Sequence, residues 1–515
     1  MIENLRLSLS DLLGADYTRA VCEARALLTG ENPEALRALA DEKIDWYPEA
    51  FARRQEELME RVGCRVTDGF AGDEAGAPTD SYRAAQHSGA APLSALGAFR
   101  AGEDGRLYFT GKSEHYQIPL GHGFPGYALI DRARALGVPN ATHNNTRGFI
   151  TRTLERRLIA AANGLAPGNP ALEGVIASRE PGVLSRVINL ETGSLAVEAA
   201  LKMMLARFYS LDGSSAPYAG RIPVFLVMAD QAGGLAGNYH GTTVVAQTLR
   251  GLWPEFTRKM EDAGIYRVVS VPINDAAGFR QAIETWNTPP YKTAGFCHEI
   301  IMMNYGAIRL EEAYLQAAYR LCRESDTPVL CDEIQSCAWY EGLFLFRQYG
   351  LAPDFVSVGK GFPGGVYPAS RLLLSGAFDI LSQFGALVTN GQEELASLAY
   401  LITMAFIEAN GPHIRKTGRL YHEEMRGLAE RHPDLCVGVA GDAHMTALHF
   451  HRVQDATAFC RRMAQERCVD ISAQTYKPNC PPAALTKLPL TATPAMVCKL
   501  VALFEEALEG KEAEA

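Results

Sequence analysis

Short apolar runs that alternate with longer stretches of helical spacing constrain the fold of this chain more than any other feature. The apolar runs are 221–229, 267–273, 295–303, 328–334 and 354–360. An intervening segment, 310–325, repeats apolar residues at the spacing of an amphipathic helix. Strands that are apolar throughout are typical of a parallel sheet buried between two layers of helices. The pattern therefore predicts an α/β fold with a mainly parallel sheet flanked by helices.

The two ends of the chain differ from this central region. Residues 1–100 begin with helical spacing and continue into a stretch, 67–96, that is rich in Gly, Ala, Asp and Ser. We expect them to form a helical N-terminal extension and a linker. Residues 101–395 would form the large domain, with part of the small domain at its start. A long apolar helix then ends at the stop signal Gly411, and residues 396–515 would form a smaller α+β domain.

Charge and cysteine content argue against several partners and compartments. The formal net charge of −10 disfavours a nucleic acid or an anionic membrane as the main partner. The first residues show no basic stretch followed by an apolar run, and no apolar stretch is long enough to span a bilayer. The 11 cysteines are scattered without CxxC pairs, which is typical of reduced thiols. We expect a cytoplasmic protein with no nucleic-acid or membrane partner.

Two charged residues stand at the ends of predicted buried strands. Lys360 closes the run 354–360, and Asp332 lies near the end of the run 328–334. Burial lowers the pKa of a lysine, and a neutral amine is the form that Schiff-base chemistry requires. A buried carboxylate requires a cationic partner, which the ring nitrogen of pyridoxal phosphate would provide. The alternatives are a lysine that extends to solvent and a structural ion pair of Asp332 with another residue.

A turn before a predicted helix adds a third element. The segment NLETGSLAVEAALKMM, 189–204, opens with Thr192, Gly193 and Ser194. The free N–H groups and the dipole of a helix N-terminus bind anions, so this turn would hold the phosphate of the cofactor. A simple N-cap is the alternative, because many helices begin with Ser or Thr. His449 and His451 alternate on a predicted strand, but no carboxylate or cysteine completes a site there, so we expect no bound metal.

From about residue 105 to its end, the chain resembles the class III (omega-type) aminotransferases of fold type I. Five motifs carry the resemblance in the family's order: IPLGHGFPG, NLETGSLAVEAALK, GNYHGTTVVAQTLRG, the CDEIQ segment with the lysine segment VGKGFPGG, and TNGQEELASLAYL. The resemblance implies a large domain built on a mainly parallel seven-stranded sheet and a smaller α+β terminal domain. It also implies that the cofactor is pyridoxal 5′-phosphate.

The resemblance implies a role for each matching residue around the cofactor ring. Lys360 would form the Schiff base and move a proton between the substrate α-carbon and the cofactor. Asp332 would pair with the ring nitrogen, and Gln335 would hydrogen-bond the phenolic oxygen. Ile334 and Tyr239 would pack on the two faces of the ring.

Further matches imply contacts around the edge of the site. His240 would lie beside the ring-stacking tyrosine, and Gly193 and Ser194 would contact the phosphate. Thr389 would reach the phosphate of a neighbouring subunit, which implies a homodimer with shared active sites. Glu299 matches the family's glutamate at a strand end and would gate substrate binding.

The chain departs from the family where substrates are recognised. Thr242 and Tyr340 stand where the family has arginines, and Leu195 replaces a glutamate of the phosphate motif. Near the C-terminus Lys487 is the nearest cation to the position of a further family arginine. An arginine fork is the usual clamp for a carboxylate. The substrate therefore stays open.

The activity that these features favour is transfer of an amino group between an amine or amino acid and an oxo acid. Racemases, decarboxylases, aminomutases and lyases share the same scaffold, so one of these reactions is the second hypothesis. A non-catalytic binding protein that kept the fold is the third, although retention of both Lys360 and Asp332 argues against it.

Overall fold

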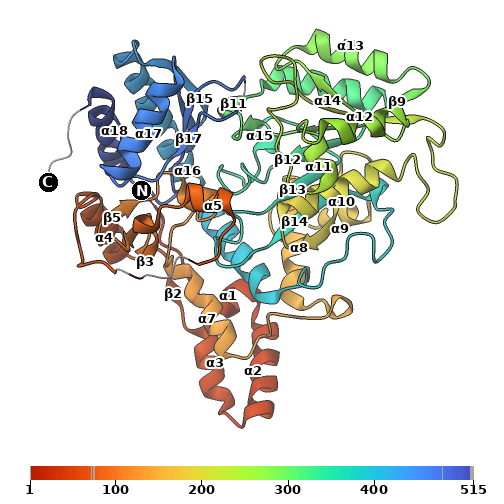
Figure 1. The fold of residues 1–515 in the computed structure, drawn as a ribbon. Helices are drawn as coiled ribbons and strands as arrows, with labels where there is room; N and C mark the ends of the chain where they lie inside the picture. The colour runs from red at the N-terminus through yellow and green to blue at the C-terminus, as the bar shows by residue number, and fades with distance from the viewer. Residues whose placement is uncertain (1, 71, 73–75, 478, 511–515) are drawn as a thin grey trace.

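The computed structural model describes residues 2–70, 72, 76–477 and 479–510. At its centre lies a seven-stranded sheet with the order β6-β14-β13-β12-β9-β7-β8 (Figure 1). Its strands are β6 (Leu184–Leu190), β7 (Ile222–Met228), β8 (Arg267–Val271), β9 (Tyr291–His298), β12 (Val329–Asp332), β13 (Phe355–Val358) and β14 (Ser370–Ser375). All neighbouring pairs are parallel except those of β14, which runs antiparallel to β13 and β6. The predicted mainly parallel seven-stranded sheet is confirmed, and each of the five apolar runs supplies one strand.

Helices cover both faces of this sheet. Alternate residues of a strand point to opposite faces, and in β7 Phe225 and Val227 pack into a different core cluster from Val224 and Leu226. One face is covered by α10 (Gly193–Leu205) and α11 (Val244–Thr248), whose buried residues share a cluster with Phe225. The other face is covered by α8 (Phe149–Ala162), α13 (Ala276–Trp286), α14 (Glu312–Glu324) and α16 (Glu394–Arg431). Burial on both faces explains why these strands are apolar throughout.

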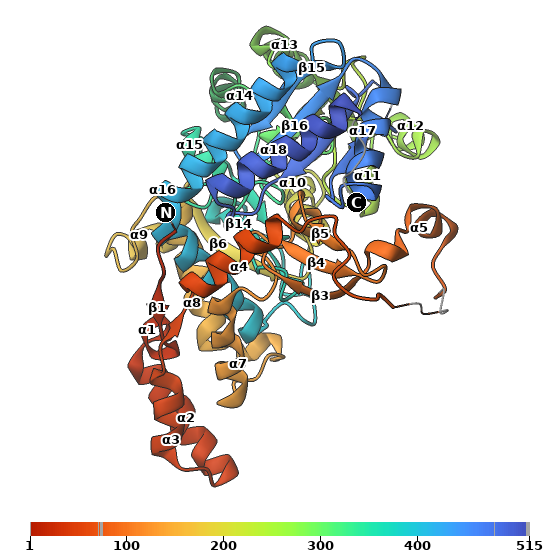
Figure 2. The same cartoon turned by 90° about the vertical axis from the view of Figure 1, so that its left-hand side faces the viewer.

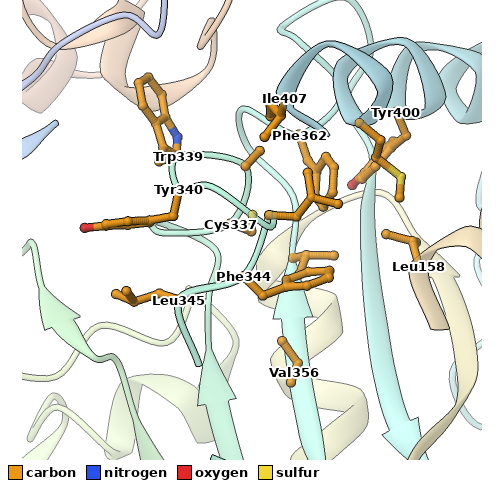
Figure 3. Packing of buried hydrophobic residues seen from close by; sticks show 14 of the residues in the cluster. Leu158, Cys337, Trp339, Tyr340, Phe344, Leu345, Val356, Phe362, Tyr400 and Ile407 are labelled. Atoms are coloured by element: carbon orange, nitrogen blue, oxygen red, sulfur yellow. The ribbon is translucent and has the colours of Figure 1, made fainter. Parts of the chain in front are cut away.

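The segment that follows β12 packs against α16. Figure 3 shows Cys337, Trp339 and Phe344 from this segment in one buried cluster with Phe362 and with Tyr400 of α16. The segment contains the short helix α15 (Leu345–Gln348). This packing fixes the chain between the two strands that carry Asp332 and Lys360.

The predicted stop at Gly411 coincides with a break in helix α16, but the helix resumes beyond it. The helix is interrupted at Asn410, where φ is −105° and ψ is 15°, and it then continues through Pro412 to Arg431. The Asn410 side chain accepts a hydrogen bond from the backbone N–H of Glu3 at 2.6 Å, which holds the interruption in place. Beyond it, buried residues continue along one side of the helix as far as Leu428 and Ala429. Burial of this second half outweighs the local preference of Gly and Pro to end a helix.

A second core joins the C-terminal part of the chain to residues before the central sheet. The four-stranded sheet has the order β15-β16-β18-β17, and a three-stranded sheet has the order β3-β4-β5 (Figure 2). The strands are β15 (Cys436–Asp442), β16 (Met445–Phe450), β17 (Ser472–Gln474), β18 (Ala483–Lys487), β3 (Pro92–Leu96), β4 (Phe99–Gly102) and β5 (Leu107–Phe109). Their helices are α17 (Val453–Gln465), α18 (Pro494–Glu509) and α4 (Glu49–Met59). Phe99 and Phe109 share one buried cluster with Phe459 and Phe504.

The N-terminal helices project from the body of the molecule (Figures 1 and 2). They are α1 (Leu9–Leu13), α2 (Ala15–Thr29) and α3 (Pro33–Asp41), with the strand pair β1 (Arg6–Leu7) and β2 (Ile44–Asp45) at their base.

Segment 67–96, expected to be a loop, contains α5 (Asp80–Ala85) and β3. The remaining elements are α6 (Ser113–Tyr116), α7 (Ala128–Ala135), α9 (Leu172–Ala177), α12 (Pro254–Asp262), β10 (Ile301–Met302) and β11 (Ile308–Arg309). Within the described ranges, no helix combines the length and the apolar character that a membrane crossing requires.

Candidate active site

A cavity of about 420 Å³ lies at the carboxyl ends of β12 and β13, next to the N-terminus of α10. Ligands of open α/β sheets bind at this edge. The predicted site residues that line the cavity are Gly193, Ser194, Tyr239, His240, Asp332, Ile334 and Lys360. Gln117 and the loop 365–370 form further parts of the wall. The structure thus brings together residues that are far apart in the sequence.

Asp332 ends β12 as a buried carboxylate that is held from both sides. Its Oδ2 lies 2.9 Å from Nδ1 of His240, and its Oδ1 accepts a hydrogen bond from the backbone N–H of Ile334 at 3.2 Å. The hydroxyl of Ser357, on the neighbouring strand β13, donates to the same Oδ1. Because both oxygens are bonded, the carboxylate has a fixed orientation in the cavity wall. Ser357 was not predicted from the sequence.

Lys360 follows β13 and adopts a left-handed backbone conformation with φ of 45°. Burial lowers the pKa of its amine, and the carboxylates of Glu299 and Asp332 offset part of that decrease. Its Nζ lies 5.3 Å from the centre of the Tyr116 ring. The preceding Gly359 cannot carry a side chain, since a Cβ there would lie 2.1 Å from Oγ of Ser370. A lysine with a lowered pKa is suited to act as a nucleophilic amine.

The N-terminus of α10 forms one end of the cavity. Thr192 caps the helix, with its hydroxyl accepting from the backbone N–H of Leu195, and Gly193 and Ser194 form the first turn. A Cβ at Gly193 would lie 2.7 Å from the Ile334 side chain, so a larger residue there would displace Ile334. Ser194 Oγ accepts a hydrogen bond from the backbone N–H of Thr242 at 3.1 Å, which ties the turn to the segment after His240. The helix N-terminus provides an anion site in this wall.

Several buried polar atoms at the site have no partner among the described residues. They are Nε2 and Oε1 of Gln335, Nε2 of His240 and Oε2 of Glu299. Buried polar atoms are normally hydrogen-bonded, so such a group indicates a place for a ligand. An anion site, a fixed carboxylate, an amine of lowered pKa and free amide atoms fit a phosphorylated pyridine aldehyde such as pyridoxal phosphate.

Three predicted residues lie outside the cavity wall. Gln335 is buried directly behind Ile334. Glu299 is 3% exposed, and burial, followed by the charge of Asp332, raises the pKa of its carboxyl well above the usual value. Thr389 is exposed in the connection between β14 and α16. Within the described chain nothing brings Thr389 to the cavity.

Tyr116 and Lys487 are two neighbours of Lys360 that received no role from the sequence. Lys487, at the end of β18, is fully buried, and its Nζ lies 4.7 Å from the Tyr116 ring centre and 4.3 Å from that of Trp339. It donates to the backbone carbonyl of Gln335. Burial, together with the charge of Lys360, lowers the pKa of Lys487 well below its usual value. The sequence singled out Lys487 only as the cation nearest to the position of a family arginine, within the apolar run AALTKLPL.

Comparison with protein families identifies one match. The sequence model of the family described as Aminotransferase class-III matches residues 90–471. The putrescine aminotransferase of Pectobacterium atrosepticum is 25% identical over 350 residues, which cover 66% of this chain and 70% of the relative. The ornithine aminotransferase of Bacillus subtilis is 28% identical over 283 residues, which cover 54% of this chain and 59% of the relative.

Solved structures show the same fold. The adenosylmethionine-8-amino-7-oxononanoate aminotransferase of Methanocaldococcus jannaschii matches with a TM-score of 0.65 and 17% identity, covering 90% of this chain and 99% of that one. The ornithine aminotransferase of Toxoplasma gondii matches with a TM-score of 0.64 and 18% identity, covering 81% and 90%. The predicted fold type I architecture is confirmed.

Proposed function

The chain belongs to the class III aminotransferase family, and on that premise we propose how its own residues carry out pyridoxal-phosphate-dependent transamination. The reaction moves an amino group from an amine or amino acid to an oxo acid. One observation carries the assignment of the site: Lys360, Asp332 and the N-terminus of α10 line a single cavity. When bound there, pyridoxal phosphate supplies an electron sink for the negative charge that develops at the substrate α-carbon.

Each wall of the cavity has its own task. Gly193 and Ser194 hold the phosphate through the first turn of α10. Asp332, oriented by His240 and Ser357, holds the ring nitrogen in its protonated form. Tyr239 and Ile334 enclose the ring and exclude water from it. The free amide of Gln335 hydrogen-bonds the phenolic oxygen.

Lys360 provides the amine that attaches the cofactor and later moves the proton. Burial lowers the pKa of this amine, so its Nζ would accept the proton of the substrate α-carbon and return it beside the cofactor. Glu299 lies near enough to affect the charge of Lys360 and gates access of the substrate.

The assembly and location belong to the same proposal. The enzyme works as a cytoplasmic homodimer, and exposure of Thr389 supports its contact with the phosphate of a neighbouring subunit. All 11 cysteines are free, which supports a reducing compartment. Residues 101–395 hold the cofactor, with part of the small domain at their start, residues 396–515 form the small domain, and residues 1–100 form a helical N-terminal extension and linker.

Absorbance spectroscopy tests the reaction. An amino donor added alone should convert the cofactor absorbance once, and the original spectrum should return only when an oxo acid is added. Continued product formation from the donor without an oxo acid would instead indicate decarboxylation, elimination or another reaction of the same scaffold. Purified protein that takes up no cofactor at all would contradict catalysis itself.

A further inference from the structure

A buried arginine without an ion pair lies directly behind the cavity wall, and the transamination mechanism leaves it unused. Arg371, in β14, is 1% exposed. Its Nη1 donates to the carbonyls of Ser370 at 2.9 Å and Leu190 at 3.4 Å, and its Nη2 donates to the hydroxyl of Ser397 at 3.2 Å. In the part of the chain that the structure describes, none of these partners is a carboxylate, and the buried Nε has no partner. The guanidinium therefore carries a charge that its contacts do not neutralise.

The remaining surroundings of Arg371 offer little negative charge. The Tyr400 ring of α16 (Figure 3) has its centre 5.1 Å from the guanidinium carbon. Burial lowers the pKa of the guanidinium, and the charges of Glu155 and Glu393 offset part of that decrease, but Glu155 is already paired with Arg147. Arginine stays charged even in a protein interior, and an uncompensated buried charge destabilises a fold. These surroundings favour an anion that comes from outside the chain.

Arg371 stands at the edge of the sheet that carries the cavity. Across the sheet it is level with Val358 of β13 on one side and with Asn189 of β6 on the other. Lys360 follows Val358 by two residues, and Gly193 follows Asn189 by four, and both line the cavity. The arginine is thus placed behind both the lysine side and the helix side of the site.

The two carbonyls that Arg371 binds belong to the chain that forms the cavity wall. Ser370 lines the cavity itself, and Leu190 directly precedes the lining residues 191–194. Those residues include the first turn of α10, which is the anion site of the proposed function. The guanidinium contacts this wall from behind, and a phosphate would contact it from inside. Because salt and water screen buried charges little, the two charges would attract each other through the wall.

The lining residues leave a phosphate short of positive charge. Among the described residues that line the cavity, Lys360 is the only lysine or arginine, and its amine is required for attachment of the cofactor. Glu191, beside the first turn of α10, adds a negative charge to the same wall. A phosphate monoester carries about two negative charges at pH 7, whereas a helix N-terminus provides about half a positive charge. A further cation is needed, and Arg371 is placed to provide it.

We propose that Arg371 is a positioning residue whose charge, acting through the wall, makes the cavity select the phosphorylated form of its cofactor. The inference rests on the proposed function, because it takes the cofactor phosphate to lie at the N-terminus of α10. Arg371 acts without touching the ligand, since its donors are directed to the carbonyls of Ser370 and Leu190 and to Ser397. It contributes charge, while the backbone of the turn provides the direct hydrogen bonds.

Equilibrium titration of the full-length protein, freed of cofactor, tests this selection. The probes are pyridoxal 5′-phosphate and pyridoxal, which share the ring and the aldehyde, and absorbance reports the binding of each. Wild-type protein should prefer pyridoxal 5′-phosphate, and Arg371→Met should reduce that preference about tenfold, which corresponds to about 1.4 kcal/mol. Pyridoxal should bind to both proteins equally. Arg371→Gln, which keeps a donor without the charge, should show the same loss, and Arg371→Lys, which restores the charge, should retain most of the preference.

The matched control is Arg186→Met, on the same pair of strands but further from the cavity. Arg186 of β6 is level with Leu374 of β14 and forms an ion pair with Asp379 at 3.5 Å. This variant should keep the preference of the wild type. Circular dichroism checks the fold of each variant, and if Arg371→Met does not fold, Arg371→Gln decides the same comparison.

Three results would overturn the inference. The first is an unchanged preference in Arg371→Met. The second is equal weakening of both ligands, because Arg371 would then only hold the wall in shape. The third is a loss in Arg371→Lys as large as in Arg371→Met, because charge would then not be the cause. Wild-type protein that binds neither ligand would contradict the proposed cofactor site and this inference with it, whereas binding without the expected preference would contradict the inference alone.

Discussion

Lys360 at the end of β13 and Lys487 at the end of β18 are two buried lysines that lie over the same Tyr116 ring. They come from the central sheet and from the C-terminal sheet, and both end an apolar strand. Only Lys360 lines the cavity, where Glu299 and Asp332 support its charge. Lys487 faces two aromatic rings and one carbonyl, and it senses the charge of Lys360.

The two amines differ in their surroundings more than in their depth. Burial lowers the pKa of both amines, but the carboxylates near Lys360 keep its charged form accessible, as proton transfer requires. Burial, and then the charge of Lys360, lowers the pKa of Lys487 well below its usual value, and Glu299 offsets only part of that decrease. The hydrogen bond from Lys487 to the Gln335 carbonyl positions the backbone of Gln335, whose side-chain amide atoms have no partner among the described residues. We interpret Lys487 as a positioning residue.

The largest expected effect tests which of the two lysines carries the cofactor. Lys360→Ala should abolish the attachment and lower turnover by about a thousandfold or more, because the nucleophilic amine is lost. Borohydride reduction followed by peptide mass spectrometry identifies the modified lysine. Lys487→Met is the control and should keep the adduct on Lys360. An adduct found on Lys487 in the wild type or in Lys360→Ala would reverse the roles assigned here.

Removing the charge of Asp332 should have the next largest effect. Asp332→Asn keeps the shape and the hydrogen bond from Ser357, but it cannot hold a protonated ring nitrogen, so turnover should fall about a hundredfold. Steady-state kinetics and the cofactor absorbance measure this loss. Ser357→Ala keeps the carboxylate and removes only one of its donors, so a loss of a few fold is expected. If both variants behaved alike, the charge of Asp332 would not matter.

The smallest expected effect is on the free energy of unfolding, and it tests the environment of Lys487. The amine of an unfolded lysine titrates near pH 10.4, and in the folded protein it takes up its proton only at lower pH. Between the two pKa values the unfolded chain binds more protons, so the unfolding free energy rises with pH. Lys487→Met should remove this contribution and raise the unfolding free energy at pH 7 by about 1–3 kcal/mol.

Urea unfolding at pH 7 and at pH 10 checks the stability prediction. The gain of Lys487→Met over the wild type should shrink as the pH rises toward 10. A variant that is less stable than the wild type at both pH values would show that the hydrogen bond to Gln335 outweighs the cost of burying the amine.

Part of the proposed cofactor site could be predicted from the sequence, because several of its residues lie at the end of a buried strand or at the start of a helix. Lys360, Asp332 and Gly193 occupy such positions, and local patterns reveal them. The sheet was predictable for the same reason, since burial on both faces makes its central strands apolar.

The rest of the site depends on contacts between distant segments. Tyr116 reaches Lys360 through a turn whose residues give no glycine signal, and Ser357 meets Asp332 only when β12 and β13 pair. Helix α16 continues past Gly411 because tertiary burial outweighs local preference. None of these contacts has a periodicity that a sequence can show.

The turn that carries Tyr116 also bears on how the protein is made. Ser113, Glu114, His115 and Tyr116 all have positive φ, from 47° to 76°. Each such non-glycine residue costs about 1–2 kcal/mol, so the turn needs contacts that hold it. Glu114 is held by Arg100, and the Ser113 hydroxyl donates to the carbonyl of Lys487 at 2.7 Å, 374 residues further along the chain. A ribosome must therefore synthesise the chain through β18 before Tyr116 can settle over Lys360, and a chain truncated before β18 would keep most of its central sheet yet lack a finished candidate site.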